Sequence, residues 1–211
     1  MYVPEHFLEA RIDVLQGFLE RHPLATVVAM TGDGLTANHI PLQSKLTAEG
    51  KGLLSGHIAR SNSLWRQLEQ DADVLAIFTG ADAYISPNWY PSKREHGKAV
   101  PTWNYATVHI KGSIRFIDDL VWLRDFVGSL TDSHERGLPQ RWQVGDAPAD
   151  YIDGMLRAIV GFEIQIASII GKFKGSQNRP AADRAGVGEA LRSSGHELEA
   201  IAELAPGSSP T

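Results

Sequence analysis

The sequence predicts an α+β fold in which a barrel-like antiparallel sheet of about six strands carries helices at its margins. Several segments alternate apolar and polar residues with the period of a strand, and short polar or glycine-rich turns join them. Apolar residues also recur at helical spacing near both ends of the chain. No internal repeat or linker divides the chain, so we expect one domain over residues 1–205 and a frayed tail over 206–211.

The first half of the chain predicts two helices, a hairpin and two further strands. Residues 8–22 carry apolar residues at helical spacing and end before Pro23. The turn at Gly32–Gly34 joins two apolar runs into a hairpin, and Ser61 or Asn62 can cap a helix that ends at about residue 70. The four strands expected here are 24–31, 35–43, 53–58 and 74–79, the last of which residues 84–86 can continue.

The second half predicts two long strands and three helices. Over residues 103–117 the even-numbered apolar residues share one face of a strand, and the odd-numbered aromatic and polar residues share the other. Either Asp118 or Asp119 caps a helix that runs to about residue 130, and 131–148 reads as a loop with a short helical turn. We expect a last strand from about Val160 to Lys174, then helices near 180–193 and 195–204.

Composition excludes several classes of protein. At 43% hydrophobic, the 211 residues can bury a core, and 25 acidic against 20 basic residues do not favour a general affinity for nucleic acid or anionic lipid. The chain has no cysteine, which excludes disulfides and thiolate chemistry. The N-terminus lacks a signal-peptide pattern, and the apolar runs fall short of the roughly 20 residues that span a bilayer. We therefore expect a soluble, cytoplasmic protein without membrane contact.

An aromatic segment between residues 81 and 111 is the most informative part of the chain. Two of the five tryptophans and three of the five tyrosines lie between Tyr84 and Tyr105, among short hydrogen-bonding side chains. Such a mixture suits a planar ligand with polar edges, or an amphipathic protein interface. Both interpretations hold if the ligand lies at the interface.

Two polar clusters are candidate anion sites. Gly56–Asn62 runs from a strand end into a helix start, where an Arg and free backbone N–H groups can hold a phosphate. An ordinary helix cap with a surface Arg explains it equally well. Lys172–Arg179 combines three cations with Ser, Gln and Asn, which is typical of an anion clamp but also of a solvated basic turn.

Other chemistry has no clear basis in the sequence. The eight histidines are scattered, no two have the spacing of a helical metal site, and we expect no metal. Hydrolase, P-loop and dinucleotide-binding fingerprints are absent, and no catalytic residue can be named.

Six collinear blocks of this sequence resemble the PaiB family, which is described as FMN-binding negative transcriptional regulators. The blocks are Met1–Phe7, Asn38–Leu42, Gly56–Asn62, Tyr84–Tyr90, Val100–Tyr105 and Lys174–Arg179. The match extends to about residue 192. Ser61 and Ser63 depart from it, because alanine and proline are common there, and the last twenty residues match nothing in particular.

The resemblance implies the FMN-binding split-barrel fold, a six-stranded barrel that forms homodimers with FMN in the groove between subunits. It places the cofactor against three groups of side chains and adds three candidates for lining the ring or reaching from the partner subunit. The groups are His57, Arg60, Ser61 and Asn62; Trp103, Asn104 and Tyr105; and Lys174, Gln177 and Arg179. The added candidates are Tyr84, Trp89 and Tyr90.

Three functions follow from the resemblance and the residues together. The first is an FMN protein with a redox or sensing role, an oxidoreductase if it turns over, with a reduced nicotinamide as a candidate electron donor. The second is a transcriptional repressor acting on DNA directly or through partners, although the −5 charge and the lack of a helix-turn-helix pattern argue against direct DNA binding. The third is a haem-binding or haem-degrading split barrel, with His39, His57 or His109 as a ligand.

Overall fold

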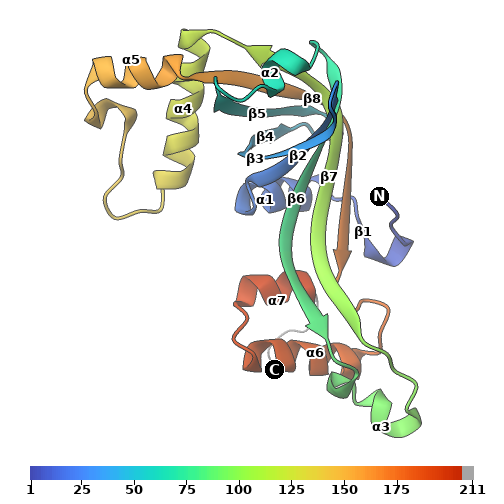
Figure 1. Cartoon of the computed structure of the whole chain (residues 1–211). Coiled ribbons are helices and arrows are strands. Elements are labelled where there is room, and N and C mark those ends of the chain that lie inside the picture. Colours follow the sequence, from blue (N-terminus) through green and yellow to red (C-terminus); the bar gives the residue numbers. More distant parts are fainter. Residues whose placement is uncertain (206–211) are drawn as a thin grey trace. The chain divides into compact units, whose positions relative to one another are not determined.

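The structure is a computed structural model, and it describes residues 1–205 (Figure 1). The fold is α+β as predicted, but the described residues hold eight strands rather than six. The strands are β1 (Leu8–Glu9), β2 (Leu24–Thr31), β3 (Gly34–Pro41), β4 (Gln43–Leu46), β5 (Gly52–Ala59), β6 (Ala72–Ile85), β7 (Thr102–Ile117) and β8 (Ile159–Lys174).

Helices occupy much of the remaining chain. The α-helices are α1 (Ile12–Arg21), α2 (Leu64–Gln67), α3 (Ser92–His96), α4 (Leu120–Glu135), α5 (Ala149–Arg157), α6 (Ala181–Ser193) and α7 (Leu198–Leu204). Three 3-10 turns are η1 (Glu5–Phe7), η2 (Pro87–Trp89) and η3 (Val144–Asp146). Within the described residues, none of the helices combines the length and the apolar character that crossing a membrane requires.

The two additional strands have separate causes. The short strand β1 exists because Leu8 and Glu9 pair with Lys172 and Gly171 of β8, a long-range contact that no local pattern reveals. The segment expected as one strand over 35–43 is divided at Leu42, whose buried side chain and N–H···O bond to Pro23 (2.8 Å) turn the chain.

That turn at Leu42 closes the sheet. The strand order is β3-β2-β6-β7-β8-β5-β4, so β3 and β4 lie at opposite ends of the order although one residue separates them in sequence. The sheet must therefore curl until its two ends meet. β3 and β5 lie side by side, yet no ladder joins them in the part of the chain described here. We call this place the β3–β5 seam.

The chain folds as two compact units. The barrel unit comprises Leu19–Ile77 and Ile110–Ile169, and the terminal unit comprises Met1–Phe18, Phe78–His109 and the chain from Ile170. Strands β6, β7 and β8 contribute residues to both. The prediction of one domain over 1–205 is not tested by this division and stays a prediction. The predicted tail, 206–211, lies outside the described residues.

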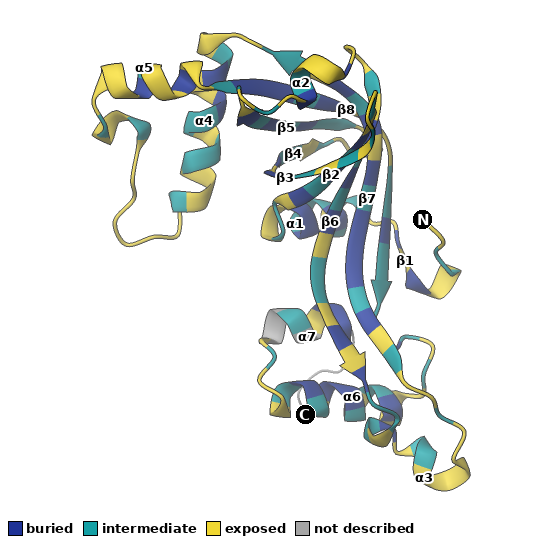
Figure 2. Cartoon of the chain, viewed as in Figure 1, coloured by how far each residue is buried: buried dark blue, intermediate teal, exposed yellow. Residues whose placement is uncertain are grey.

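Each unit has its own core. Along β7 buried residues recur at every second position, as the alternation predicted, and the apolar run of β2 is buried in the same way (Figure 2). In the barrel unit α4 and α5 pack on each other through Leu123, Ile152 and Leu156. In the terminal unit α6 and α7 pack on the end of β6, with Ile85 and Leu191 fully buried.

The helix boundaries correct several expectations. The helix expected over 8–22 begins only at Ile12, and the one expected to reach residue 70 ends at Gln67. The helix that follows Asp119 continues to Glu135 rather than residue 130, and the final helix begins at Leu198 rather than 195. Helix α5 was not expected, because its short apolar stripe becomes meaningful only when α4 lies beside it.

Candidate functional site

The β3–β5 seam contains a pocket of about 330 Å³. It is lined by β3 residues 38–41 and by the end of β5, together with Asn62 and Ile159. Two strands that approach without a ladder leave unpaired polar groups and space between them. The pocket thus unites two of the sequence blocks described above, Asn38–Leu42 and Gly56–Asn62.

His57 is the most informative side chain of this pocket. Its Nδ1 atom is buried and has no hydrogen-bond partner among the described residues. The ring meets Phe126 of α4 edge to face, with the centroids 5.9 Å apart. Burial lowers the pKa of His57, so the imidazole is neutral at pH 7. An unpaired buried nitrogen is costly unless a ligand or water completes it.

Asn62 joins the two sides of the seam. Its Nδ2 donates to Oδ1 of Asn38 on β3 at 2.8 Å, and its Oδ1 accepts the backbone N–H of Leu64 at 3.0 Å. The prediction that Ser61 or Asn62 caps this helix is wrong: the N-cap position of α2 is Ser63, which makes no side-chain cap bond, and Asn62 accepts only the N–H of the first helical residue. Ser61 is exposed beside it.

Arg60 connects β5 to two other segments of the barrel unit. Its guanidinium donates to both carboxylate oxygens of Asp118, at 2.9 and 2.5 Å. It also donates to the backbone oxygens of Arg157 (2.7 Å) and Ile159 (3.1 Å). This pairing lowers the pKa of Asp118 and raises that of Arg60. Arg60 therefore has a structural role, whether or not it also meets a phosphate.

The terminal unit carries the second group of predicted residues. Lys174 at the end of β8 donates to Thr102 Oγ1 (2.5 Å) and to the backbone oxygen of Trp103. Lys172 lies 5.1 Å from the ring centre of Tyr105 and 5.9 Å from that of Tyr2. Burial and the charge of Lys172 lower the pKa of Lys174. Neither lysine pairs with a carboxylate in the described structure. Their positive charges would therefore stabilise a bound anion.

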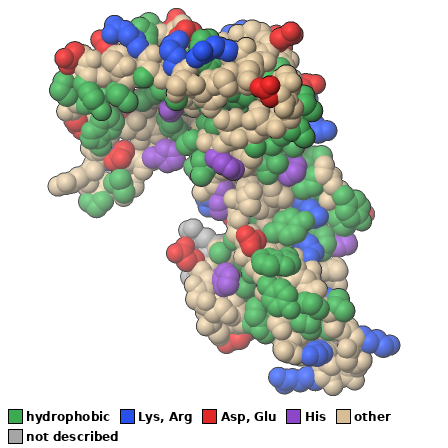
Figure 3. Space-filling view, viewed as in Figure 1, with side chains coloured by type: hydrophobic (Ala, Val, Ile, Leu, Met, Phe, Trp, Pro, Cys, Tyr) green, Lys and Arg blue, Asp and Glu red, His purple; other side chains and the backbone are tan. Residues whose placement is uncertain are grey.

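Aromatic rings accompany these lysines. Trp103 is 54% exposed and meets Tyr84 edge to face at 6.1 Å. Figure 3 shows exposed hydrophobic side chains with Lys or Arg among them over β1 and the lower ends of β7 and β8. Exposed rings beside cations suit a planar anionic ligand or a protein interface, the same two interpretations that the sequence left open.

The side chain of Asn104 points into the protein, unlike the exposed ring of Trp103. It is fully buried, and its Nδ2 donates to Ser176 Oγ (3.0 Å) and to the backbone oxygen of Leu204 (2.7 Å). The Ser176 hydroxyl lies 3.3 Å from Asn104 Oδ1. These bonds tie β7 to α7 and to the turn after β8. They favour a structural role for Asn104.

The other candidates of the terminal unit are engaged locally. Gln177 donates to the backbone oxygen of Phe173 (2.5 Å) and accepts from the N–H of Gly175 (2.7 Å), which shapes the turn after β8. Arg179 lies 4.8 Å from the ring centre of Tyr90. The Tyr90 ring is buried, and its hydroxyl has no partner among residues 1–205. Trp89 packs against the same core.

Sequence reasoning missed some functional contacts. Asp118 and Asp119 were interchangeable as caps, but the structure gives the cap to Asp119 and the Arg60 pair to Asp118. Nothing local distinguishes the two, because Asp118 lies 58 residues from Arg60. The contact of Phe126 with His57 could not be predicted either, because the sequence pattern indicates only that Phe126 is a core residue of a helix.

Comparison with known proteins identifies the family. Residues 1–168 match the family model described as "Putative FMN-binding domain". The chain belongs to this FMN-binding family. It is 32% identical over 194 residues to "Protease synthase and sporulation protein PAI 2" of Bacillus subtilis, covering 91% of this chain and 89% of that protein. The resemblance to PaiB is thereby confirmed, and FMN is the cofactor that the family assigns to this chain.

Solved structures confirm the fold. The FAD and heme binding protein of Mycobacterium smegmatis superposes with a TM-score of 0.61 at 16% identity, covering 90% of this chain and 81% of that one. The flavocytochrome Anf3 of Azotobacter vinelandii gives a TM-score of 0.59 at 16% identity, covering 81% and 72%. The family shares the split-barrel fold with these proteins, as the sequence predicted, although with eight strands.

The residues present fit FMN. The unpaired Nδ1 of His57 can accept a hydrogen bond from the ligand, and Asn38 and Asn62 add amide groups at the same seam. Lys172 and Lys174 supply positive charge without a carboxylate partner in the described chain, beside exposed aromatic rings. Hydrogen-bonding groups, unpaired cations and exposed rings are the kinds of groups that bind the polar edges, the phosphate and the ring of FMN.

Proposed function

We propose that the protein is an FMN-dependent redox protein or flavin sensor that works as a homodimer. The observation that carries the site is the buried, unpaired Nδ1 of His57 in the β3–β5 seam. A buried polar atom without a partner, in a pocket shared by two family blocks, is best explained by a ligand that completes it.

The residues proposed to bind FMN come from the seam and from the terminal unit. His57, Ser61 and Asn62 bind polar groups of FMN, and any free donor of Arg60 adds to its phosphate site. Trp103, Tyr105, Lys174, Gln177 and Arg179 of the terminal unit are a separate set of candidates for binding FMN. Tyr84, Trp89 and Tyr90 are the candidates for contacts across the dimer. When bound, FMN supplies hydride and single-electron chemistry.

The protein's own residues tune this chemistry by position and electrostatics. A neutral His57 accepts a hydrogen bond without adding charge near the ligand. Lys174 has its ammonium fixed by Thr102 Oγ1 and the Trp103 carbonyl, so its positive charge stays in one place. A fixed charge stabilises a developing negative charge better than a mobile one.

Redox chemistry is supported better than direct DNA binding. Specific DNA recognition draws on a clustered basic surface, whereas the chain has a net charge of −5. Lys172 and Lys174, in its densest basic stretch, already contact aromatic rings and backbone oxygens. Any regulatory effect would then act through flavin chemistry or a protein partner.

The test is spectroscopic. The purified protein should show the visible bands of oxidised flavin, and mass spectrometry of the released ligand should give FMN. Anaerobic addition of NADH or NADPH should bleach the bands and air should restore them. A haem spectrum would replace this proposal by the haem alternative, and a flavin that no nicotinamide reduces would remove the proposed donor. Specific, salt-resistant binding to its own upstream DNA, at least about a thousandfold tighter than to random DNA, would restore the repressor.

A further inference from the structure

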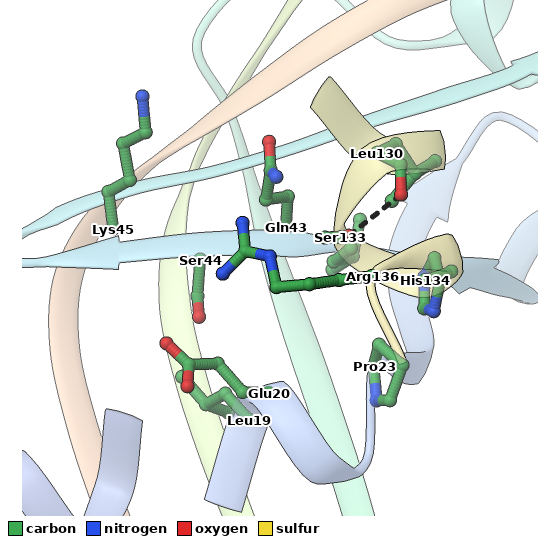
Figure 4. A pocket seen from close by; sticks show the side chains of 11 residues that line it. Leu19, Glu20, Pro23, Gln43, Ser44, Lys45, Leu130, Ser133, His134 and Arg136 are labelled. Atoms are coloured by element: carbon green, nitrogen blue, oxygen red, sulfur yellow. Dashed lines mark hydrogen bonds between the residues drawn. The ribbon is translucent and has the colours of Figure 1, made fainter. Parts of the chain in front are cut away.

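A second pocket of about 330 Å³ lies in the barrel unit, outside the seam (Figure 4). Three elements form it: the end of α1, strand β4 and the last turns of α4. No residue that lines it also lines the seam pocket. It therefore needs an explanation separate from FMN.

The lining divides into an apolar and a polar part. Leu19, Leu42 and Leu130 supply the apolar surface, and Gln43, Ser44 and Ser133 supply hydrogen-bonding groups. Small-molecule sites typically combine an apolar lining with a few polar groups that fix orientation. A volume of about 330 Å³ lies at the lower end of the range for small-molecule sites.

Two cations of this pocket, Arg136 and Lys45, form no ion pair with a described residue, although the carboxylate of Glu20 also lines the pocket. Arg136 reaches from the end of α4 across the pocket toward β4, and Lys45 stands at the far rim (Figure 4). Neither side chain forms a hydrogen bond or ion pair among the residues the structure describes, whereas Arg11, Arg60 and Arg124 are all paired with carboxylates. An unpaired guanidinium in a concave site of an acidic chain favours a bound anion.

The walls are fixed by hydrogen bonds. Gln43 Nε2 donates to Ser129 Oγ at 3.0 Å, which joins β4 to α4. Ser133 Oγ donates to the backbone oxygen of Leu130 at 2.7 Å (Figure 4). The N–H of Leu42 donates to the carbonyl of Pro23. A pocket built on bonded elements is preformed, which reduces the entropy cost of binding.

We propose that this pocket binds a small organic monoanion, a carboxylate with an apolar body. The carboxylate pairs with the Arg136 guanidinium, Lys45 adds longer-range attraction, and the apolar body covers the leucine surface. Glu20 also lines the pocket and disfavours a second negative charge on the ligand. The site thus selects a monocarboxylate over a dicarboxylate of the same length.

The test uses calorimetric titration of the full-length, FMN-loaded protein with hexanoate. Three comparison probes each change one property of hexanoate. Hexylamine reverses the sign of the charge, adipate adds a second negative charge, and inorganic phosphate lacks the apolar body. Hexanoate should bind saturably at one site per chain, with hexylamine showing no binding and adipate and phosphate each binding at least about tenfold more weakly. Saturable hexylamine binding, or adipate or phosphate as tight as hexanoate, would overturn the assigned chemistry.

Variants locate the site. Arg136→Gln should weaken hexanoate binding about tenfold or more, whereas Arg115→Gln, at an exposed arginine of β7 in the same unit, should not change it. Ser133→Phe should abolish binding by filling the pocket while all charges stay. Thermal melting and flavin content establish that each variant is folded. No saturable binding to the wild type, equal effects of the two arginine variants, or full binding by a folded Ser133→Phe protein would each refute the proposal.

Discussion

Replacing Asn104 by alanine should destabilise the terminal unit without weakening flavin binding by the folded protein. Asn104 is fully buried and donates to Ser176 Oγ and to the carbonyl of Leu204. The alanine variant leaves these two groups without their donor. A buried group that loses its partner costs about 1–3 kcal/mol, so we expect a loss of about 2–4 kcal/mol in unfolding free energy once partial relaxation is allowed.

Urea denaturation followed by circular dichroism and tryptophan fluorescence measures this loss, and hydrogen exchange locates it. Exchange should accelerate in α6 and α7, because Leu204 ends α7. Asn88→Ala is the matched control, since Asn88 is exposed in the same unit and should change stability by less than about 0.5 kcal/mol. An Asn104→Ala protein as stable as the control, or one that is stable but no longer binds FMN, would refute the structural role of Asn104.

Three further predictions follow from the same contacts. Burial lowers the pKa of His57 below its ordinary value of 6.5, so at mildly acidic pH the histidine is protonated in the unfolded chain before it is protonated in the folded one. The unfolding free energy should therefore fall as pH drops below about 6.5. Denaturation at several pH values should show a shallower fall for His57→Gln, and an unchanged slope would contradict the assignment. Asp118→Asn should lower the melting temperature, because Arg60 loses its carboxylate partner. If Arg60 also binds the phosphate, Arg60→Gln should weaken the binding of FMN about ten- to a hundredfold and that of riboflavin much less, which titration of both ligands measures. Sedimentation should give twice the 23.1 kDa chain mass, and Trp103→Ala should reduce both dimer stability and flavin affinity; a monomeric wild type would exclude the dimer.

The regular elements of the fold were predictable because their patterns are local. Strand β7 follows from alternation, β2 follows from its apolar run, and the β2–β3 hairpin follows from the glycine turn between its strands. The same alternation placed even-numbered residues of β7 on the core face, and it could have shown that Asn104 points inward. What could not be predicted depends on distant pairing: β1 needs β8, and α5 needs α4.

The site was predictable to a different degree at each residue. The seam residues His57 and Asn62 were named from their sequence block, and the structure places both at one pocket. Arg60 was also named, but its bonds to Asp118 and to the carbonyls near residue 158 depend on the closure of the barrel. The pocket beside Arg136 was not visible at all, because α1, β4 and α4 are far apart in the sequence.

The central claim, that FMN binds at the β3–β5 seam against His57, is tested most directly by titrating FMN into protein stripped of its flavin. The wild type should bind one FMN per chain. His57→Leu should weaken that binding about tenfold or more, because the ligand loses the bond to Nδ1. His109→Leu is the matched control, a partly buried histidine of β7 outside the pocket whose pKa is also lowered by burial, and it should bind FMN as the wild type does. Equal affinities for the wild type and a folded His57→Leu variant would contradict the claim.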